Sequence, residues 1–371
     1  MNSTVSSTLN GSRTVECHFV FLSQLLRKPF LQTSIQAVLI FSIVVHFSTC
    51  SFTVLLNVLV IVGVKTKRRL TTKANILLAC LASTDLSVGL LVQPCHVAME
   101  MILLLPSGNV STSNFCALTE ALGWIFDIFC SASLYHLLLI STERYAALKH
   151  PIFHNRSVTN TRIVISSVTA RLITLVTCLV YSISEILVTF SNILRGICVV
   201  LISCFCVVVY KEVHGYKKQA MGQHLSREVK KKMFNEIKIV KTTMTIAVTA
   251  LICYVPTIAF FMVTGQAGVE GYSPEFSCGF LILATLLSIL NSLFNPLIYA
   301  VRSRRFRVAS IQLLTRQSFH RAQRIDELLF GVRRRRQQSF AEGNGDGIRN
   351  NRIGRPKEAA LQFIAVQELA A

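Results

Sequence analysis

Two charged side chains stand together where a long apolar run ends, in Glu143-Arg144-Tyr145. The preceding sequence contains no lysine or arginine back to Ala74. Placing an acid and an arginine at the end of a membrane span costs free energy, which indicates a part in a mechanism. A guanidinium is always charged and pairs with carboxylates, so the predicted chemistry is an ion pair with a neighbour or with an acid on another helix.

Three further residues in apolar runs point to a mechanism. Asp85 is a lone carboxylate in the middle of one run, where burial without a partner would be destabilising. We therefore expect it to be neutral or to have a cation or a polar shell around it. Pro256 and Pro296 each remove a backbone hydrogen bond inside a helix, which makes them candidate hinges.

No pattern for covalent or metal chemistry accompanies these residues. There is no nucleophile–base pair, Cys-x-x-Cys motif or phosphate loop, so we expect no enzyme. Three cysteines fall in segments expected outside the cell, where disulfides can form: Cys17, Cys116 and Cys278. Three glycosylation sequons are expected on the same side: Asn2, Asn10 and Asn109.

The composition indicates a protein that crosses a membrane several times. Of 371 residues 52% are apolar, and the mean hydropathy is +0.53. Seven apolar runs are long enough, at about 1.5 Å per residue, for a hydrocarbon core of about 30 Å. They are Ser34–Val64, Ala74–Leu105, Cys116–Ala147, Thr161–Ser184, Ile193–Gly215, Met233–Thr264 and Phe276–Val301.

The positive charge is segregated, which predicts the topology. The net charge is +20, and the basic residues cluster in Lys65–Lys73, Lys149–Arg162, Lys211–Lys241 and after Arg302. By the positive-inside rule these segments are cytoplasmic, so the N-terminal residues 1–33 lie outside and the C-terminus lies inside. Because the charge lies in short loops between spans, we expect no nucleic-acid partner. We expect a multi-pass protein of the plasma membrane.

The segment after the last span has basic and apolar residues at helical spacing. Residues 302–318 are therefore expected to form an amphipathic helix on the inner leaflet of the bilayer. Residues 319–371 are expected to be a disordered basic tail. In it Arg333–Arg336, followed by Ser339, is a candidate for contact with anionic lipid or for a kinase site. The predicted fold is an all-α membrane protein: a seven-transmembrane helix bundle, residues 34–301, with an amphipathic eighth helix.

The chain carries one motif per helix, in a fixed order, and in this it resembles the rhodopsin-like (class A) G-protein-coupled receptors. The carrying residues are Asn57, Leu81-Ala82-Ser83-Thr84-Asp85, Ser133, Glu143-Arg144-Tyr145, Tyr210, Cys253-Tyr254-Val255-Pro256, Asn295-Pro296-Leu297-Ile298-Tyr299 and Phe306. The resemblance implies an extracellular ligand, a heterotrimeric G protein and, as further partners, arrestin and kinases.

The same resemblance implies a two-state switch at the cytoplasmic end. Arg144 would be held by Glu143 and Glu236 in the inactive state and released toward Tyr210 and Tyr299 in the active one. The full set of implied switch residues is Glu143, Arg144, Tyr145, Tyr210, Glu236, Asn295, Pro296 and Tyr299. Pro256 would be a hinge, and Tyr254 stands at the usual position of the toggle tryptophan.

The resemblance also implies a sodium site at Asp85. The shell would comprise Ser133, Asn291, Ser292 and Asn295. The alternative is a protonated aspartate in a polar network without sodium, and Phe129 stands where many relatives have a polar shell residue.

Several positions depart from the family pattern. Arg171 replaces the tryptophan of the fourth helix, so we expect it to pair or to reach toward the interface. Ile202 replaces the proline of the fifth helix, and Thr119 replaces the usual disulfide cysteine. A bridge of Cys278 with Cys17 or Cys116 is the alternative. In these departures the chain resembles the melanocortin, cannabinoid, lysophospholipid and adenosine receptors within class A.

The outer side indicates a cationic ligand. Candidate ligand-binding residues are Glu100, Phe126, Asp127 and Tyr254. Asp127 lies one position beyond the aspartate that amine receptors use, and one step rotates a helical side chain by about 100°. Six acids make the outer side acidic: Glu100, Glu120, Asp127, Glu185, Glu270 and Glu275. Such an acidic mouth would attract a cationic peptide or an amine, although these acids could equally serve solubility. Two alternatives to a signalling receptor are a receptor-like scaffold without signalling and a seven-helix transporter or channel.

Overall fold

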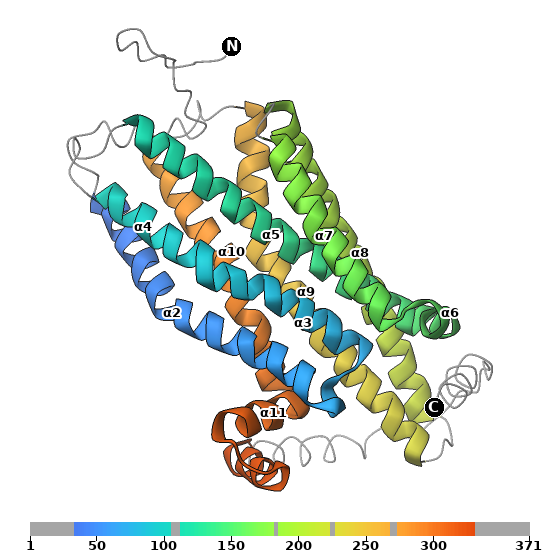
Figure 1. Cartoon of the computed structure of the whole chain (residues 1–371). Helices are drawn as coiled ribbons and strands as arrows, with labels where there is room; N and C mark the ends of the chain where they lie inside the picture. The colour runs from blue at the N-terminus through green and yellow to red at the C-terminus, as the bar shows by residue number, and fades with distance from the viewer. Residues whose placement is uncertain (1–32, 105–111, 182–184, 223–226, 268–272, 331–371) are drawn as a thin grey trace, which may run out of the picture.

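The computed structural model describes residues 33–104, 112–181, 185–222, 227–267 and 273–330 (Figure 1). Every regular element within these ranges is helical. The three sequons, Cys17 and the polybasic run Arg333–Arg336 lie outside them.

Seven helices are long and apolar enough to cross a membrane, as the sequence predicted. They are α2 (Thr33–Thr66), the composite of α3 (Lys73–Ser87), η2 (Val88–Val92) and α4 (Gln93–Leu104), α5 (Thr112–Lys149), α7 (Asn160–Tyr181), α8 (Glu185–Gly222), α9 (Arg227–Ala267) and α10 (Pro274–Arg302). Three short elements lie at the ends of the spans: η1 (Arg68–Leu70), α6 (Pro151–Ser157) and α11 (Arg304–Thr315). The expected spans agree with these bounds within a few residues, except at α8 and α9. Helix α8 extends beyond the expected span at both ends, from Glu185 to Gly222, and α9 begins at Arg227 instead of Met233.

The bundle is apolar on the outside and polar at its centre. Phe47 is 78% exposed and Ile252 is 63% exposed, whereas Asp85, Asn57 and Asn291 are fully buried. In water, exposing so many large apolar side chains would be unfavourable, whereas lipid tails solvate them. The buried polar groups therefore meet one another inside the bundle, and this is where the functional residues lie.

The second span is irregular where proline interrupts it. Pro94 has no N–H, and its ring would clash with the carbonyl of Leu90 in a regular α-helix. The backbone from Val88 to Val92 widens into a π-helical turn that includes this carbonyl. The backbone distortion between α3 and α4 therefore lies directly before Pro94.

The segment beyond α11 differs from the prediction. Residues 319–330 form a further helix, where a disordered tail was expected. Asp326 is buried, with 3% exposure, and pairs with Arg307 at 2.6 Å and Arg304 at 3.2 Å on α11. These ion pairs and the stacking of the Arg307 guanidinium on Phe330 hold the helix against α11. The assignment of 319–371 to a disordered tail is therefore wrong for residues 319–330.

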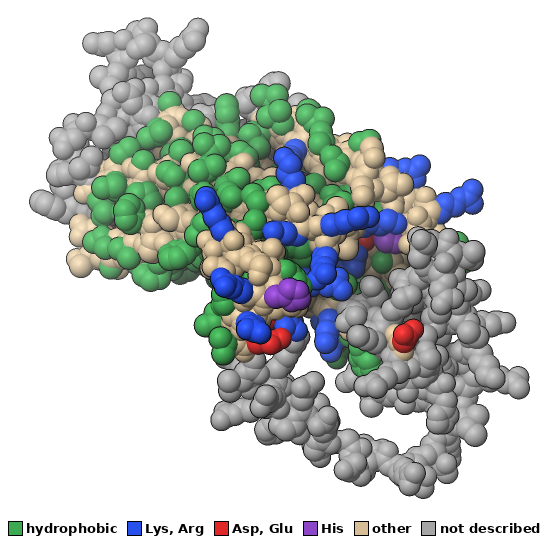
Figure 2. All heavy atoms as spheres, turned by 60° about the horizontal axis from the view of Figure 1, so that its bottom comes forward, with side chains coloured by type: hydrophobic (Ala, Val, Ile, Leu, Met, Phe, Trp, Pro, Cys, Tyr) green, Lys and Arg blue, Asp and Glu red, His purple; other side chains and the backbone are tan. Residues whose placement is uncertain are grey.

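Basic side chains gather at one end of the bundle. Figure 2 shows lysine and arginine side chains concentrated at the end where α11 lies, with few acidic side chains among them. Helix α5 runs diagonally through the bundle and packs against α3, α7, α8 and α9 (Figure 1). It therefore connects the basic end of the bundle with the opposite end.

Candidate functional site: a receptor switch

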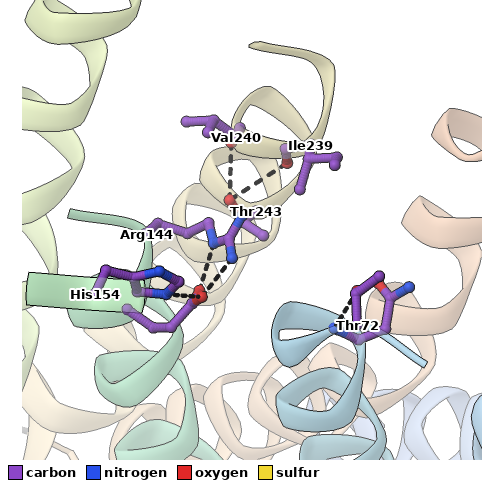
Figure 3. Close-up of polar contacts among 8 residues, drawn as sticks. Thr72, Arg144, His154, Ile239, Val240 and Thr243 are labelled. Carbon is purple, nitrogen blue, oxygen red and sulfur yellow. Dashed lines mark hydrogen bonds and ion pairs between the residues drawn. The ribbon is translucent and has the colours of Figure 1, made fainter. Parts of the chain in front are cut away.

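The C-terminal end of α5, at the basic end of the bundle, carries a closed ion-pair cluster. Arg144 Nε donates to Glu143 Oε2 at 2.5 Å, and Arg144 Nη2 donates to Oε1 at 2.5 Å. His154 Nε2 lies 2.9 Å from the same Oε1. Both Glu143 and Arg144 are more than nine-tenths buried, so this pair lies in a low-dielectric environment where its partners matter. Figure 3 shows Arg144 and His154 converging on one carboxylate.

His154 is the residue that sequence reasoning missed at this cluster. It lies on the short helix α6, which begins with Pro151 at its first turn, a position where proline favours a helix start. The helix places His154 eleven positions after Glu143, yet directly against it. Only the three-dimensional path of the connection between α5 and α7 brings the two together.

The other predicted switch residues take varied positions. Tyr145 packs its ring 5.4 Å from Phe205 on α8, whereas Tyr210 is 62% exposed. Tyr299 is buried and stacks on Phe306 at 5.6 Å, and its hydroxyl has no hydrogen-bond partner among the described residues. The side chain of Glu236 lies outside the described part of the chain. On α9, Thr243 lies opposite Arg144 (Figure 3), and the two residues line a small pocket.

Asp85 is contacted by three of the four shell residues that the resemblance implied, and Asn291 is not among them. Its Oδ1 accepts from Ser292 at 2.9 Å and from Ser133 at 3.3 Å, and its Oδ2 accepts from Asn295 Nδ2 at 2.8 Å. Asn57 ties α2 to the same region by donating to the Ser292 carbonyl at 3.0 Å. The oxygen-rich shell suits a hard cation such as sodium, and it equally suits a protonated carboxyl group.

The shell continues to the predicted toggle. Asn291 Nδ2 donates to the Tyr254 hydroxyl at 3.4 Å, so this buried hydroxyl has the partner that burial requires. About one turn further along α9, the Thr257 hydroxyl donates to the Ala284 carbonyl at 2.9 Å and lies within hydrogen-bonding distance of the Ser288 hydroxyl, at 2.8 Å. These side chains join α9 to α10 beside Pro256, where the proline removes a backbone donor.

Pro296 lies inside α10, one position after Asn295 of the shell. A backbone interruption there is next to Asp85, and Tyr299 follows one turn later. The two expected hinges lie on α9 and α10, which pack against each other.

The candidate ligand residues do not present free carboxylates. Asp127 pairs with Arg195 of α8, so the expected acidic mouth is neutralised at this position. Glu100 is 1% exposed and accepts from Ser42 at 2.7 Å. Phe126 is buried and contacts His96 edge-on, with the ring centroids 5.6 Å apart. Sequence reasoning missed Arg195, because a single arginine near the start of an apolar run carries no pairing signal.

Two further expectations concern departures from the family pattern. Arg171 donates to the Cys80 carbonyl at 2.7 Å and to the Ser83 hydroxyl, which confirms that it pairs within the bundle. Cys278 carries a free thiol that is 98% buried, which departs from the expected disulfide bridge. The side chain of Cys116 is outside the described residues.

Comparison with known proteins agrees with these features. Residues 56–299 match the family described as 7 transmembrane receptor (rhodopsin family). The chain is 27% identical over 305 residues to the histamine H2 receptor of Canis lupus familiaris, covering 72% of this chain and 77% of that protein. It is 26% identical over 286 residues to the histamine H2 receptor of Homo sapiens, covering 69% of this chain and 74% of that protein. It is 37% identical over 107 residues to the alpha-2A adrenergic receptor of Danio rerio, covering 29% of this chain and 26% of that protein.

These matches decide between the classes that the sequence left open. The family consists of receptors, so the transporter, channel and enzyme classes are set aside. The lean toward the melanocortin, cannabinoid, lysophospholipid and adenosine side is not confirmed by these relatives. Seven spans and a family match over two thirds of the sequence make this a multi-pass protein of the plasma membrane. The chain belongs to the rhodopsin family of G-protein-coupled receptors, which convert an extracellular ligand into activation of a heterotrimeric G protein.

Proposed function

We propose that this receptor is activated by a small amine that binds Asp127 in place of Arg195. The observation that carries the proposal is the Asp127–Arg195 ion pair, which joins α5 to α8. Two relatives support an amine, since histamine H2 and alpha-2A adrenergic receptors are similar to this chain. Histamine is itself an amine, and a protonated amine is a natural competitor for a guanidinium at a carboxylate.

The position of the pair supports a ligand site. Asp127 lies roughly 25 Å from Arg144 along α5, at 1.5 Å per residue, so the pair is in the half of the bundle opposite the basic end. The side chains of Arg195 and Asp127 are 10% and 19% exposed. A ligand that enters there meets a pair that is partly exposed, and breaking the pair would remove a polar contact between α5 and α8.

The pair also defines the ligand chemistry. Removing one partner from a buried ion pair costs about 3–5 kcal/mol, because the other charge is left uncompensated. A ligand that takes Asp127 must therefore offer Arg195 an acceptor of its own. We infer an amine that also carries a hydroxyl, phenol or carboxylate group, rather than a plain alkylamine.

The test is a second-messenger screen in cells that express the full chain. Matched pairs of amines, with and without an acceptor group, are compared on the wild type, Asp127→Asn and Arg195→Gln at equal surface expression. We expect the acceptor-bearing amines to act on the wild type, and Asp127→Asn to abolish the response. Arg195→Gln should raise the potency of plain amines, because the competitor is gone.

Responses to cationic peptides alone would contradict the amine proposal and favour the second ligand class. A response that survives Asp127→Asn would contradict the assignment of the binding residue. The matched control is Glu212→Gln, because Glu212 pairs with Lys149 at 2.6 Å at the cytoplasmic end and should leave ligand potency unchanged.

We also propose that the N-terminus is extracellular and that the α11 end faces the cytoplasm. The clustering of basic side chains at that end supports this orientation through the positive-inside rule (Figure 2). An epitope tag before residue 33 should be accessible to antibody in intact cells, and accessibility only after permeabilisation would contradict it. Kinases and arrestin are also proposed as partners. The candidate kinase site at Ser339 lies outside the described residues.

A sodium ion at Asp85 is proposed as a cofactor of the inactive state. The support is the shell of Ser133, Ser292 and Asn295 around its two carboxylate oxygens. Sodium bound there would hold α3, α5 and α10 together and so oppose the movement of α10.

A further inference from the structure

A second polar cluster lies between α2 and α4, apart from the switch and from Asp85. His46 comes from α2, and His96 and Glu100 come from one face of α4, four residues apart. One potential ligand atom from each residue lies within 4.8 Å of the other two. All three side chains are more than nine-tenths buried. Neither α2 nor α4 would gather three such groups for packing alone.

The cluster is incompletely satisfied. Glu100 Oε1 accepts from the Ser42 hydroxyl at 2.7 Å. The other oxygen of Glu100, His46 Nδ1 and His96 Nε2 have no hydrogen-bond partner among the described residues. A buried carboxylate that is bonded only to a neutral hydroxyl requires a compensating positive charge. That charge must come from a proton or from a metal ion.

The ligand chemistry favours a metal ion. Two imidazoles and one carboxylate form a common protein ligand set for zinc, with a fourth position left for water or a ligand. Magnesium and calcium prefer shells made of oxygen, so a set with two nitrogens discriminates against them. We propose that His46, His96 and Glu100 bind one divalent transition-metal ion of the zinc class.

The required adjustment is small. A tetrahedral centre with bonds of about 2.1 Å places its ligand atoms about 3.4 Å apart. The three groups, within 4.8 Å of one another, reach that spacing by side-chain rotation, because His46 and His96 already face each other with ring centroids 5.9 Å apart. Ser42 would orient the carboxylate as a hydrogen-bonding neighbour of the metal ligand.

The site is placed to affect signalling. His96 contacts Phe126 edge-on, and Phe126 immediately precedes Asp127 on α5. Metal bound at His96 would fix that imidazole and, through Phe126, one wall beside the Asp127–Arg195 pair. The metal is therefore a candidate modulator of ligand response, while metal binding itself does not depend on the amine proposal.

The test uses the purified full chain in lipid nanodiscs after removal of metals with a chelator. Zinc chloride is titrated, and bound metal is measured by mass spectrometry together with the melting temperature. We expect one zinc per receptor and a higher melting temperature, with no such effect of magnesium or calcium. His46→Gln and His96→Gln should weaken zinc binding by roughly 100-fold or more, and Ser42→Ala by about 10-fold.

Two variants separate metal loss from misfolding. His96→Cys keeps a zinc ligand and should retain zinc binding, whereas His96→Gln should lose it. His136→Gln is the matched control, because His136 is a fully buried histidine with an unpartnered nitrogen but lies outside the cluster. Failure of the wild type to retain zinc would overturn the proposal, leaving a proton as the compensating charge. Equal zinc binding by His46→Gln and His136→Gln would overturn it as well.

Discussion

The cluster at the cytoplasmic end makes a quantitative prediction for His154→Ala. This substitution removes the 2.9 Å contact of His154 Nε2 with Glu143 Oε1 and leaves the Arg144 pairing intact. A hydrogen bond to a charged group contributes about 1.5–3 kcal/mol. Because Glu143 keeps its arginine, we take the lower value, about 1.5 kcal/mol, as the loss.

That loss applies to the inactive state only, because activation releases Arg144 from the cluster. About 1.4 kcal/mol corresponds to a tenfold change in an equilibrium constant. If about 1% of the unliganded receptor is active, His154→Ala raises this to about 10%. The assay is ligand-free nucleotide exchange on a purified G protein by receptor in nanodiscs, at equal receptor concentration.

His214→Ala is the control, because His214 is exposed at the cytoplasmic end of α8 and should leave basal exchange unchanged. Basal exchange of His154→Ala that equals the wild type would contradict a stabilising role of His154 in the inactive state. It would show either that water replaces the imidazole at no loss or that His154 stays on Glu143 in the active state.

Three other substitutions test contacts elsewhere in the structure. Asp85→Asn should abolish the inhibition of basal exchange by sodium chloride, measured against choline chloride at equal ionic strength, because the carboxylate is the only charge in that shell. Arg171→Leu should leave the melting temperature unchanged or raise it, because Ser83 already donates to the Cys80 carbonyl at 2.7 Å and the substitution removes a charge from the span. Asp326→Asn should destabilise the helix 319–330 by about 1–2 kcal/mol, allowing for partial solvent screening, and speed its cleavage in limited proteolysis.

Each of these has a clear contrary result. Sodium inhibition that persists in Asp85→Asn would remove the proposed ion from that site. A melting temperature for Arg171→Leu several degrees below the wild type would show that the guanidinium stabilises the contact between α7 and α3. Unchanged proteolysis of Asp326→Asn would show that the helix 319–330 is held by its apolar contacts.

The sequence predicts the membrane spans because hydrophobic length is a local property. Each apolar run in this chain is long enough to cross a bilayer, and backbone satisfaction in lipid leaves a helix as the only option for such a run. The Asp85 shell was likewise predictable, through the family resemblance and not through composition. The structure brings Ser133, Ser292 and Asn295 to that carboxylate as the resemblance implied.

Pairings between distant segments were not predictable, because they depend on how each helix is rotated about its axis. Asp127 was expected to be available to a ligand, yet Arg195 on another helix neutralises it. His154 reaches Glu143 through a loop path that no local pattern encodes. The helix 319–330 was missed for a related reason, since its polar composition resembles a disordered tail until Asp326 is paired with α11.

Arg144 is proposed to be restrained by Glu143 in the inactive receptor and to drive coupling once released. The most direct measurement is ligand-free and amine-stimulated nucleotide exchange for Glu143→Gln and Arg144→Ala beside the wild type, at equal surface expression. We expect opposite effects: higher basal exchange in Glu143→Gln, and loss of both basal and stimulated exchange in Arg144→Ala. Exchange that is unchanged in Arg144→Ala, or lowered equally by both substitutions, would contradict it.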